Sequence, residues 1–95
     1  MKTEKMIEYF REKGFEVKHR IVHAGIYFTM AEARLVKGNP EKFILYAEGI
    51  ARRSHTQEPD STIGRDLATN RAVASILKKF HRHGKNKTVH HWAMA

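Results

Sequence analysis

Apolar residues recur at helical spacing near the start of the chain. Met6, Ile7 and Phe10 fall on one side of a predicted helix, and Thr3 stands where a helix N-cap is expected. Gly14 follows as a typical C-terminal stop, because glycine readily adopts the left-handed backbone that ends many helices. A helix this short is marginally stable alone, so we expect its apolar side to pack against the rest of the domain.

From residue 15 onward, apolar and polar residues alternate, which is the pattern of half-buried strands. We predict strands over residues 15–23, 26–38 and 43–53, with short turns between them. The alternation in the second segment is imperfect, and a bulge or a strong twist near Met30 would reconcile it. Gly49 weakens the third strand and suggests a bend or the close approach of another backbone.

A second helical pattern follows a polar loop and runs from Ile63 to about Phe80. Asn70 lies within its apolar arc, where we expect the amide to bond to strand or loop backbone, with a ligand-facing amide as the alternative. The apolar residues cover half of the helix, and we expect this side to dock on the sheet. They are Ile63, Leu67, Val73, Ala74, Ile76, Leu77 and Phe80.

These elements predict an α+β fold of the order α-β-β-β-α. Because short turns join consecutive strands, we expect one three-stranded antiparallel sheet with two helices packed on one face. We expect a single domain over residues 1–80, followed by a basic, histidine-rich C-terminal tail over residues 81–95.

The charge balance indicates the class of partner. The chain of 95 residues has 18 Lys and Arg against 10 Asp and Glu, which gives a formal net charge of +8. Such an excess favours polyanions, with nucleic acid first among them. The sequence has no cysteine, no apolar leader and no apolar run long enough to span a membrane, so we expect a cytoplasmic protein.

Basic residues gather on the side of the second helix opposite its predicted docking side, separated by small residues such as Ala68 and Ala72. Arg65 in the first turn opposes the helix dipole. A bound anion would explain this placement, and a salt bridge to Glu58 or Asp60 would explain it equally well. We therefore predict phosphate contacts by Arg65, Arg71, Lys78 and Lys79, extended by Arg52, Arg53, Arg82, Lys85 and Lys87.

The order of elements and the second helix together resemble the double-stranded RNA-binding domain. That family's last helix has an Ala-x-Asn-x-Ala-Ala-x-x-Ala-Leu-type pattern, and the segments "YFTMAEARL" and "YAEG" resemble its second strand and third-strand end. The resemblance covers about residues 3–80 and implies the same fold and binding to duplex RNA with little sequence specificity. The helix residues in the family's register are Ala68, Asn70, Ala72, Val73, Ile76 and Leu77.

The resemblance also implies which segments contact RNA. In that family the first helix and the loop after the first strand contact minor grooves, and a lysine pair that opens the last helix holds phosphates. By position, the matching contacts here are Glu8 with its helix neighbours, His23, and Arg65. The chain departs from the family at Asp66, where the second lysine is expected, and at Thr69, which replaces a basic residue.

A weaker resemblance leads to an alternative function. The segments "YAEGIARR" and "IGRDLATNRA" resemble small uncharacterised bacterial and phage proteins. Some phage proteins of this appearance sequester nucleotide signals of host defence, which implies an anti-defence protein that binds such a nucleotide or blocks a host protein. In that alternative, the residues expected to bind the nucleotide are Asn70, Arg71 and Arg65, in a pocket at a subunit interface.

Neither catalysis nor metal binding is indicated. The chain has seven histidines, but the pairs His81/His83 and His90/His91 lack the spacing that places two imidazoles on one helix face. The sequence has no nucleophile elbow, P-loop or dinucleotide fingerprint. We therefore predict a non-catalytic nucleic-acid-binding protein without metal or cofactor, with RNA favoured over DNA. A homo-oligomer and a protein partner are left open, and no membrane partner is expected.

Overall fold

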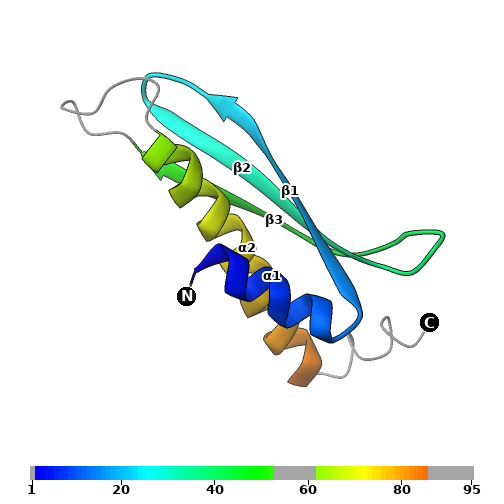
Figure 1. The fold of residues 1–95 in the computed structure, drawn as a ribbon. Coiled ribbons are helices and arrows are strands. Elements are labelled where there is room, and N and C mark those ends of the chain that lie inside the picture. The colour runs from blue at the N-terminus through cyan, green and yellow to red at the C-terminus, as the bar shows by residue number, and fades with distance from the viewer. Residues whose placement is uncertain (1, 53–61, 86–95) are drawn as a thin grey trace.

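Two helices and three strands follow one another in the order α-β-β-β-α, as the sequence predicts (Figure 1). The computed structural model describes residues 2–52 and 62–85. Within them, neither helix is long and apolar enough to cross a membrane. The elements are α1 (Thr3–Glu12), β1 (Phe15–Ala24), β2 (Phe28–Lys37), β3 (Lys42–Arg52) and α2 (Thr62–Lys85).

The three strands form one antiparallel sheet in the order β1-β2-β3, so β1 and β3 are its edges. Both helices lie along one face of this sheet, with α1 beside β1 and α2 running parallel to the strands, mainly over β3 and β2 (Figure 1). Within residues 2–52 and 62–85, no helix covers the other face. The predicted α+β class is confirmed.

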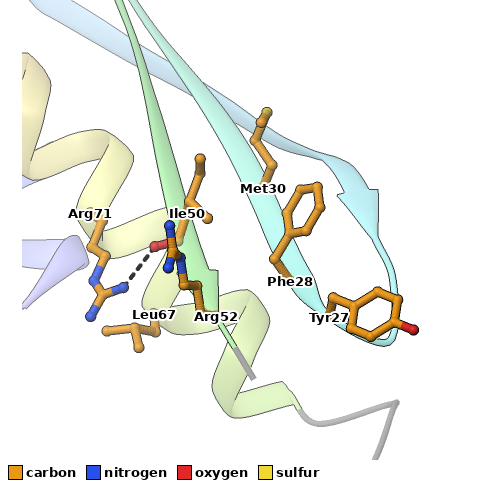
Figure 2. A pocket seen from close by; sticks show the side chains of 7 residues that line it. All are labelled: Tyr27, Phe28, Met30, Ile50, Arg52, Leu67 and Arg71. Carbon is orange, nitrogen blue, oxygen red and sulfur yellow. Dashed lines mark hydrogen bonds between the residues drawn. The ribbon is translucent and has the colours of Figure 1, made fainter. Parts of the chain in front are cut away.

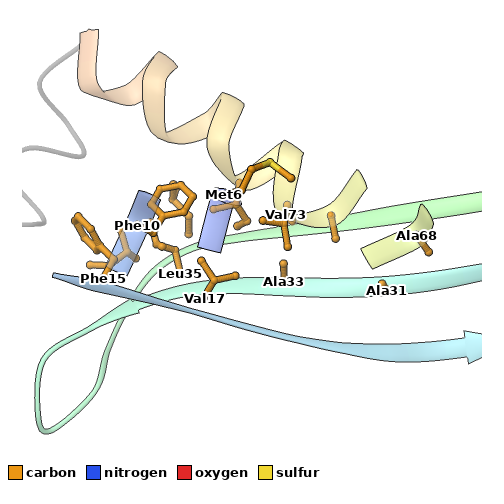
Figure 3. Close-up of a cluster of buried hydrophobic side chains, with 14 of the residues drawn as sticks. Met6, Phe10, Phe15, Val17, Ala31, Ala33, Leu35, Ala68 and Val73 are labelled. Atoms are coloured by element: carbon orange, nitrogen blue, oxygen red, sulfur yellow. The ribbon is translucent and has the colours of Figure 1, made fainter. Parts of the chain in front are cut away.

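The core fills the space between the helices and the inward face of the sheet. Met6 and Phe10 from α1 meet Val73 from α2 over Leu35 of β2 (Figure 3), and Ile76 of α2 belongs to the same cluster. All five side chains are fully buried. These residues occupy the apolar stripes that the sequence predicts for the two helices. The helix α1 ends as expected, because Gly14 follows with a φ of +87°.

Aromatic rings close one end of the core. The rings of Phe10 and Phe80 have centroids 5.3 Å apart, those of Phe15 and Phe80 5.4 Å, and those of Phe10 and Phe15 6.5 Å, all edge to face. Such pairs stabilise a fold by about 0.5–1.5 kcal/mol beyond the area they bury. The ammonium of Lys37 lies 5.1 Å from the Phe15 ring centroid and covers the cluster.

The docking side of α2 is rotated from the predicted one. Ala68 and Ala72, expected among the exposed cations, are fully buried, whereas Ile63 and Leu67, expected to dock, are 67% and 39% exposed. The cause is Gly49 of β3, where an added Cβ would lie 2.2 Å from the Ala68 carbonyl oxygen. The helix backbone rests directly on the strand, and only small residues fit between them.

The irregularity expected near Met30 lies in the neighbouring strand. In β2 the alternation is regular from Phe28 to Leu35, with Ala31 buried toward the helices and Met30 facing away, and it breaks only at Leu35 and Val36, where the pairing with β3 shifts. The pairing of β1 with β2 shifts between Ile21 and His23, opposite Ala31 and Met30, and Val22 is the extra residue. This bulge turns His23 toward the outer face of the sheet, away from the helices.

The helix α2 continues to Lys85, five residues beyond the predicted end near Phe80. Gly84 lies within this helix, because one glycine near a helix end costs only about 1 kcal/mol relative to alanine and does not stop a helix by itself. The first part of the predicted tail, residues 81–85, is therefore helical. The predicted contacts Arg53 and Lys87 lie outside the described residues.

Candidate nucleic-acid interface

The strongest concentration of positive charge in the described chain follows one side of α2. Lys78 and Arg82 are exposed, Arg71 points the same way two turns earlier, and Lys79 is half-buried beside the sheet. No acidic residue occurs in α2 after Asp66. At 1.5 Å per residue, the line from Arg71 to Arg82 is about 16 Å long. We call Arg71, Lys78, Lys79 and Arg82 the basic ridge.

The ridge is held in place by the free edge of β3. A guanidinium nitrogen of Arg71 donates to the Ile50 carbonyl at 2.7 Å, and the ammonium of Lys79 donates to the Tyr46 carbonyl at 2.8 Å. An edge strand exposes such backbone groups because no further strand pairs with them. Both acceptors are neutral, so the two side chains are positioned while their positive charge remains uncompensated.

An open groove of about 780 Å³ lies at the N-terminal end of the ridge, around the β3 edge. Figure 2 shows the hairpin and strand residues on one side of β3 and the α2 residues on the other, with Arg71 bonded to the Ile50 carbonyl. Among the residues that the structure describes, five apolar side chains and two arginines line this edge groove, and none of these seven is acidic: they are Tyr27, Phe28, Met30, Ile50, Leu67, Arg52 and Arg71.

The connection between β1 and β2 adds apolar residues that sequence reasoning placed within a strand. Ile26 and Tyr27 lie in the turn and are 64% and 75% exposed. Next to them, the His23 and Phe28 rings stack with centroids 4.5 Å apart. The signal that could have shown this is Gly25, directly before two large apolar residues. His23, a predicted contact, thus belongs to the hairpin end and not to the basic ridge.

The middle of the outer face of the sheet carries charged side chains of both signs, whereas Phe28, Met30 and Ile50 make its hairpin end apolar. Arg20 of β1 forms an ion pair with Glu32 of β2. Lys18 Nζ lies 2.6 Å from Glu41 Oε1, and the hydrogen bond to this carboxylate raises the pKa of Lys18. The hydrogen bond from the Arg20 guanidinium lowers the pKa of Glu32. Because cations and carboxylates compensate each other here, this face attracts polyanions less than the ridge does.

A tyrosine completes that network. The Tyr46 hydroxyl donates to Glu48 Oε1 at 2.7 Å and lies 3.3 Å from Glu32 Oε2. The hydrogen bond to the Glu48 carboxylate raises the pKa of Tyr46 to about 12. The phenol therefore keeps its proton across the physiological range and serves as a hydrogen-bond donor.

The helix α1 carries acidic residues along one side. Glu4, Glu8 and Glu12 are exposed and lie four residues apart, so they share one side of the helix. Nucleic acid is repelled by such an acidic stripe. Lys5 and Arg11 are exposed on the same helix, and the predicted RNA contact by Glu8 and its neighbours stays a prediction.

Asn70 acts as a structural residue. Its amide nitrogen donates to the Thr3 hydroxyl at 3.0 Å and ties α2 to the start of α1. The predicted bond of this amide to backbone stays a prediction. Thr3, the predicted cap of α1, is the first residue of the helix, and the cap position is Lys2, which makes no side-chain capping bond. Arg71, the neighbouring residue in the alternative nucleotide site, donates to the Ile50 carbonyl of β3, and that site stays a prediction.

A second hollow of about 770 Å³ lies between α1 and the beginning of α2 and includes Asn70. Glu4 and Asp66 line it together with Lys2 and His19. The two carboxylates disfavour an anionic ligand there. Of the two grooves, the edge groove is the one whose charge suits a phosphate.

The remaining predicted residues are placed as follows. Arg65 is exposed in the first turn of α2, and its predicted partners Glu58 and Asp60 lie outside the described residues. Lys85 ends the helix. His81 lies beside the rings of Tyr9 and Phe80, with centroids 6.0 Å away in each case. Over residues 2–52 and 62–85, no group of three or more His, Cys, Asp or Glu side chains could hold a metal ion.

Comparison of the chain with protein-family models, with curated proteins and with solved structures finds no match. The resemblance to the double-stranded RNA-binding domain therefore stays a prediction from the sequence pattern. What can be said of function follows from the site itself.

Proposed function

We propose that this protein is a non-catalytic nucleic-acid-binding protein whose basic ridge contacts backbone phosphates. The single observation that carries the proposal is the charge of the ridge: four cations along about 16 Å of one rigid helix, with no acidic residue among them. Phosphate neutralisation by such cations releases counterions and supplies most of the affinity in sequence-independent binding.

The geometry favours a structured nucleic acid over a flexible one. The ridge is a straight helical edge fixed to β3 by Arg71 and Lys79, so its charges keep constant spacing. A rigid array is complementary to phosphates that a duplex holds at regular intervals. The α-β-β-β-α order, shared with the double-stranded RNA-binding domain, favours RNA over DNA as the duplex.

The test is a comparison of two charge-reversal variants. Lys78→Glu/Arg82→Glu inverts the exposed end of the ridge, and Lys5→Glu/Arg11→Glu makes the same change in net charge on α1. Fluorescence anisotropy with a duplex RNA of about 16 base pairs, the length that a double-stranded RNA-binding domain spans, gives the affinities. We expect the ridge variant to lose affinity by about 100-fold or more, and the α1 variant by about tenfold or less.

Equal losses in the two variants would show that only the net charge matters and would remove the ridge from the proposal. Duplex DNA of the same length serves as the second ligand. Circular dichroism of both variants checks that α2 remains folded. This control is needed because each acidic side chain near the C-terminus of a helix destabilises the helix by about 0.3–1 kcal/mol.

A further inference from the structure

The edge groove combines aromatic and positively charged side chains around one strand edge. On one side of β3, Tyr27 and Phe28 present aromatic surface, and Phe28 is already stacked on His23. On the other side, Arg71 is held by the Ile50 carbonyl. A ligand that fills the groove must therefore be apolar and flat at one end and negatively charged at the other.

Two arginines define the charged end. Arg52 follows Ile50 on β3 and Arg71 approaches from α2, so their side chains reach the same strand edge from two elements (Figure 2). One guanidinium nitrogen of Arg71 is occupied by the Ile50 carbonyl, and the others are left to a ligand. Guanidinium groups bind phosphate oxygens through paired hydrogen bonds, and Arg71 is oriented before any ligand arrives.

The aromatic end is exposed beyond what folding requires. Tyr27 is 75% exposed in a turn, where it stabilises the core little. Aromatic side chains beside cations are the usual platform for unpaired nucleobases, because every base offers a flat face that stacks with little regard to sequence. An acidic partner or an anionic peptide would need only the arginines and would leave Tyr27 without a role.

We propose that the edge groove binds one unpaired nucleotide that adjoins the RNA duplex held by the basic ridge. The base stacks on Tyr27 beside Phe28, and its phosphate binds Arg52 and Arg71. Arg71 belongs to both surfaces, so the groove continues the ridge without a break. This inference rests on the proposed function and deepens it, since the preferred ligand becomes a duplex with an unpaired end or bulge.

The experiment compares a blunt RNA duplex of about 16 base pairs with the same duplex carrying a short single-stranded 3′ or 5′ overhang. We expect the native chain to bind one of the overhang duplexes about five- to 150-fold more tightly than the blunt duplex, as stacking of one base allows. Tyr27→Ala and Arg52→Ala should lose this preference and bind the blunt duplex as the native chain does.

The matched control is Ile26→Ala, which removes an exposed apolar side chain next to Tyr27 but outside the groove lining. It should keep the preference. Equal affinity of the native chain for the blunt and both overhang duplexes overturns the inference and leaves the proposed function standing. A preference that survives in Tyr27→Ala also overturns it.

A short single-stranded RNA as third ligand separates the two proposals. If no duplex binds but the single strand binds and Tyr27→Ala abolishes that binding, the duplex function fails, and of the inference only the stacking of an unpaired base on Tyr27 stands. If none of these RNAs binds, both proposals fail.

Discussion

At the scale of single residues, Arg71 and Lys79 show how one side chain can serve both the fold and a surface. The sequence predicts both as phosphate ligands from their side of the helix. The structure shows that both donate to carbonyls of β3, which no helical pattern reveals because the pattern does not say which strand lies at the edge. Since carbonyls are neutral, these bonds orient the two cations without removing their charge.

Tyr46 leads to a prediction about pH. The hydrogen bond to Glu48 raises its pKa to about 12, above the value near 10 expected in an unfolded chain. The folded state therefore binds the phenolic proton more tightly, and this contribution to stability is present below pH of about 10 and is lost as pH rises toward about 12. Urea unfolding across this range should show a smaller loss in Tyr46→Phe than in the native chain.

A difference titration gives the direct check. Phenolate absorbance of the native chain minus that of Tyr46→Phe isolates the Tyr46 hydroxyl. A titration midpoint of Tyr46 near pH of about 10, the pKa of tyrosine in an unfolded chain, would contradict the hydrogen bond to Glu48. The control is Glu48→Gln, which removes the acceptor charge and should return the midpoint toward about 10.

At the scale of elements, periodicity alone predicts the number, order and type of helices and strands. It misplaces the docking side of α2, because hydrophobicity weights Ile63 and Leu67 above alanine. The actual contact is decided by how closely two backbones approach, and Ala68 and Ala72 are chosen there for their small size. Gly49, whose close approach to another backbone the sequence suggests, is the partner of that contact.

Substitution by alanine should change the stability of the protein in opposite directions at Gly49 and at Gly64. A Cβ at Gly49 would meet the α2 backbone at 2.2 and 2.3 Å, so Gly49→Ala must push α2 off the sheet. We expect this variant to lose about 3 kcal/mol or more of unfolding free energy. A Cβ at Gly64 would lie 3.6 Å from Thr29 Oγ1, an ordinary contact, so Gly64→Ala should gain about 0.5 kcal/mol in the helix.

Chemical denaturation followed by circular dichroism measures both variants. Where Gly49→Ala is too unstable for a full transition, its thermal midpoint replaces the free energy. A Gly49→Ala variant as stable as the native chain would mean that α2 does not rest on β3 at this point. A destabilised Gly64→Ala would mean that the Thr29 hydroxyl needs the space.

At the scale of the whole molecule, charge is distributed unevenly between the two edges of the sheet. The acidic stripe of Glu4, Glu8 and Glu12 lies on α1, over β1, whereas the basic ridge lies along β3. The total charge predicts a polyanionic partner, because it depends only on composition. It does not predict the edge at which the partner binds, because that depends on which strand each helix covers.

The salt dependence of binding follows from this distribution. If each cation of the basic ridge neutralises one phosphate, the logarithm of the association constant should fall with the logarithm of salt concentration with a slope of about −3 to −4. Between about 50 and 200 mM salt, the affinity for duplex RNA should then decrease about 100-fold. Anisotropy titrations at several salt concentrations give the slope.

Substitution of cations by alanine then shows which side chains contact the phosphates that determine the salt dependence. Lys78→Ala/Arg82→Ala should make the slope shallower by about 2, because two counterion-releasing contacts are lost, while Lys5→Ala/Arg11→Ala should leave it unchanged. A slope near zero in the native chain would exclude phosphate neutralisation as the source of affinity. A steep slope that the ridge variant does not alter would place the phosphates on another surface. The two slopes together therefore separate the charge of the molecule from the position of its binding edge.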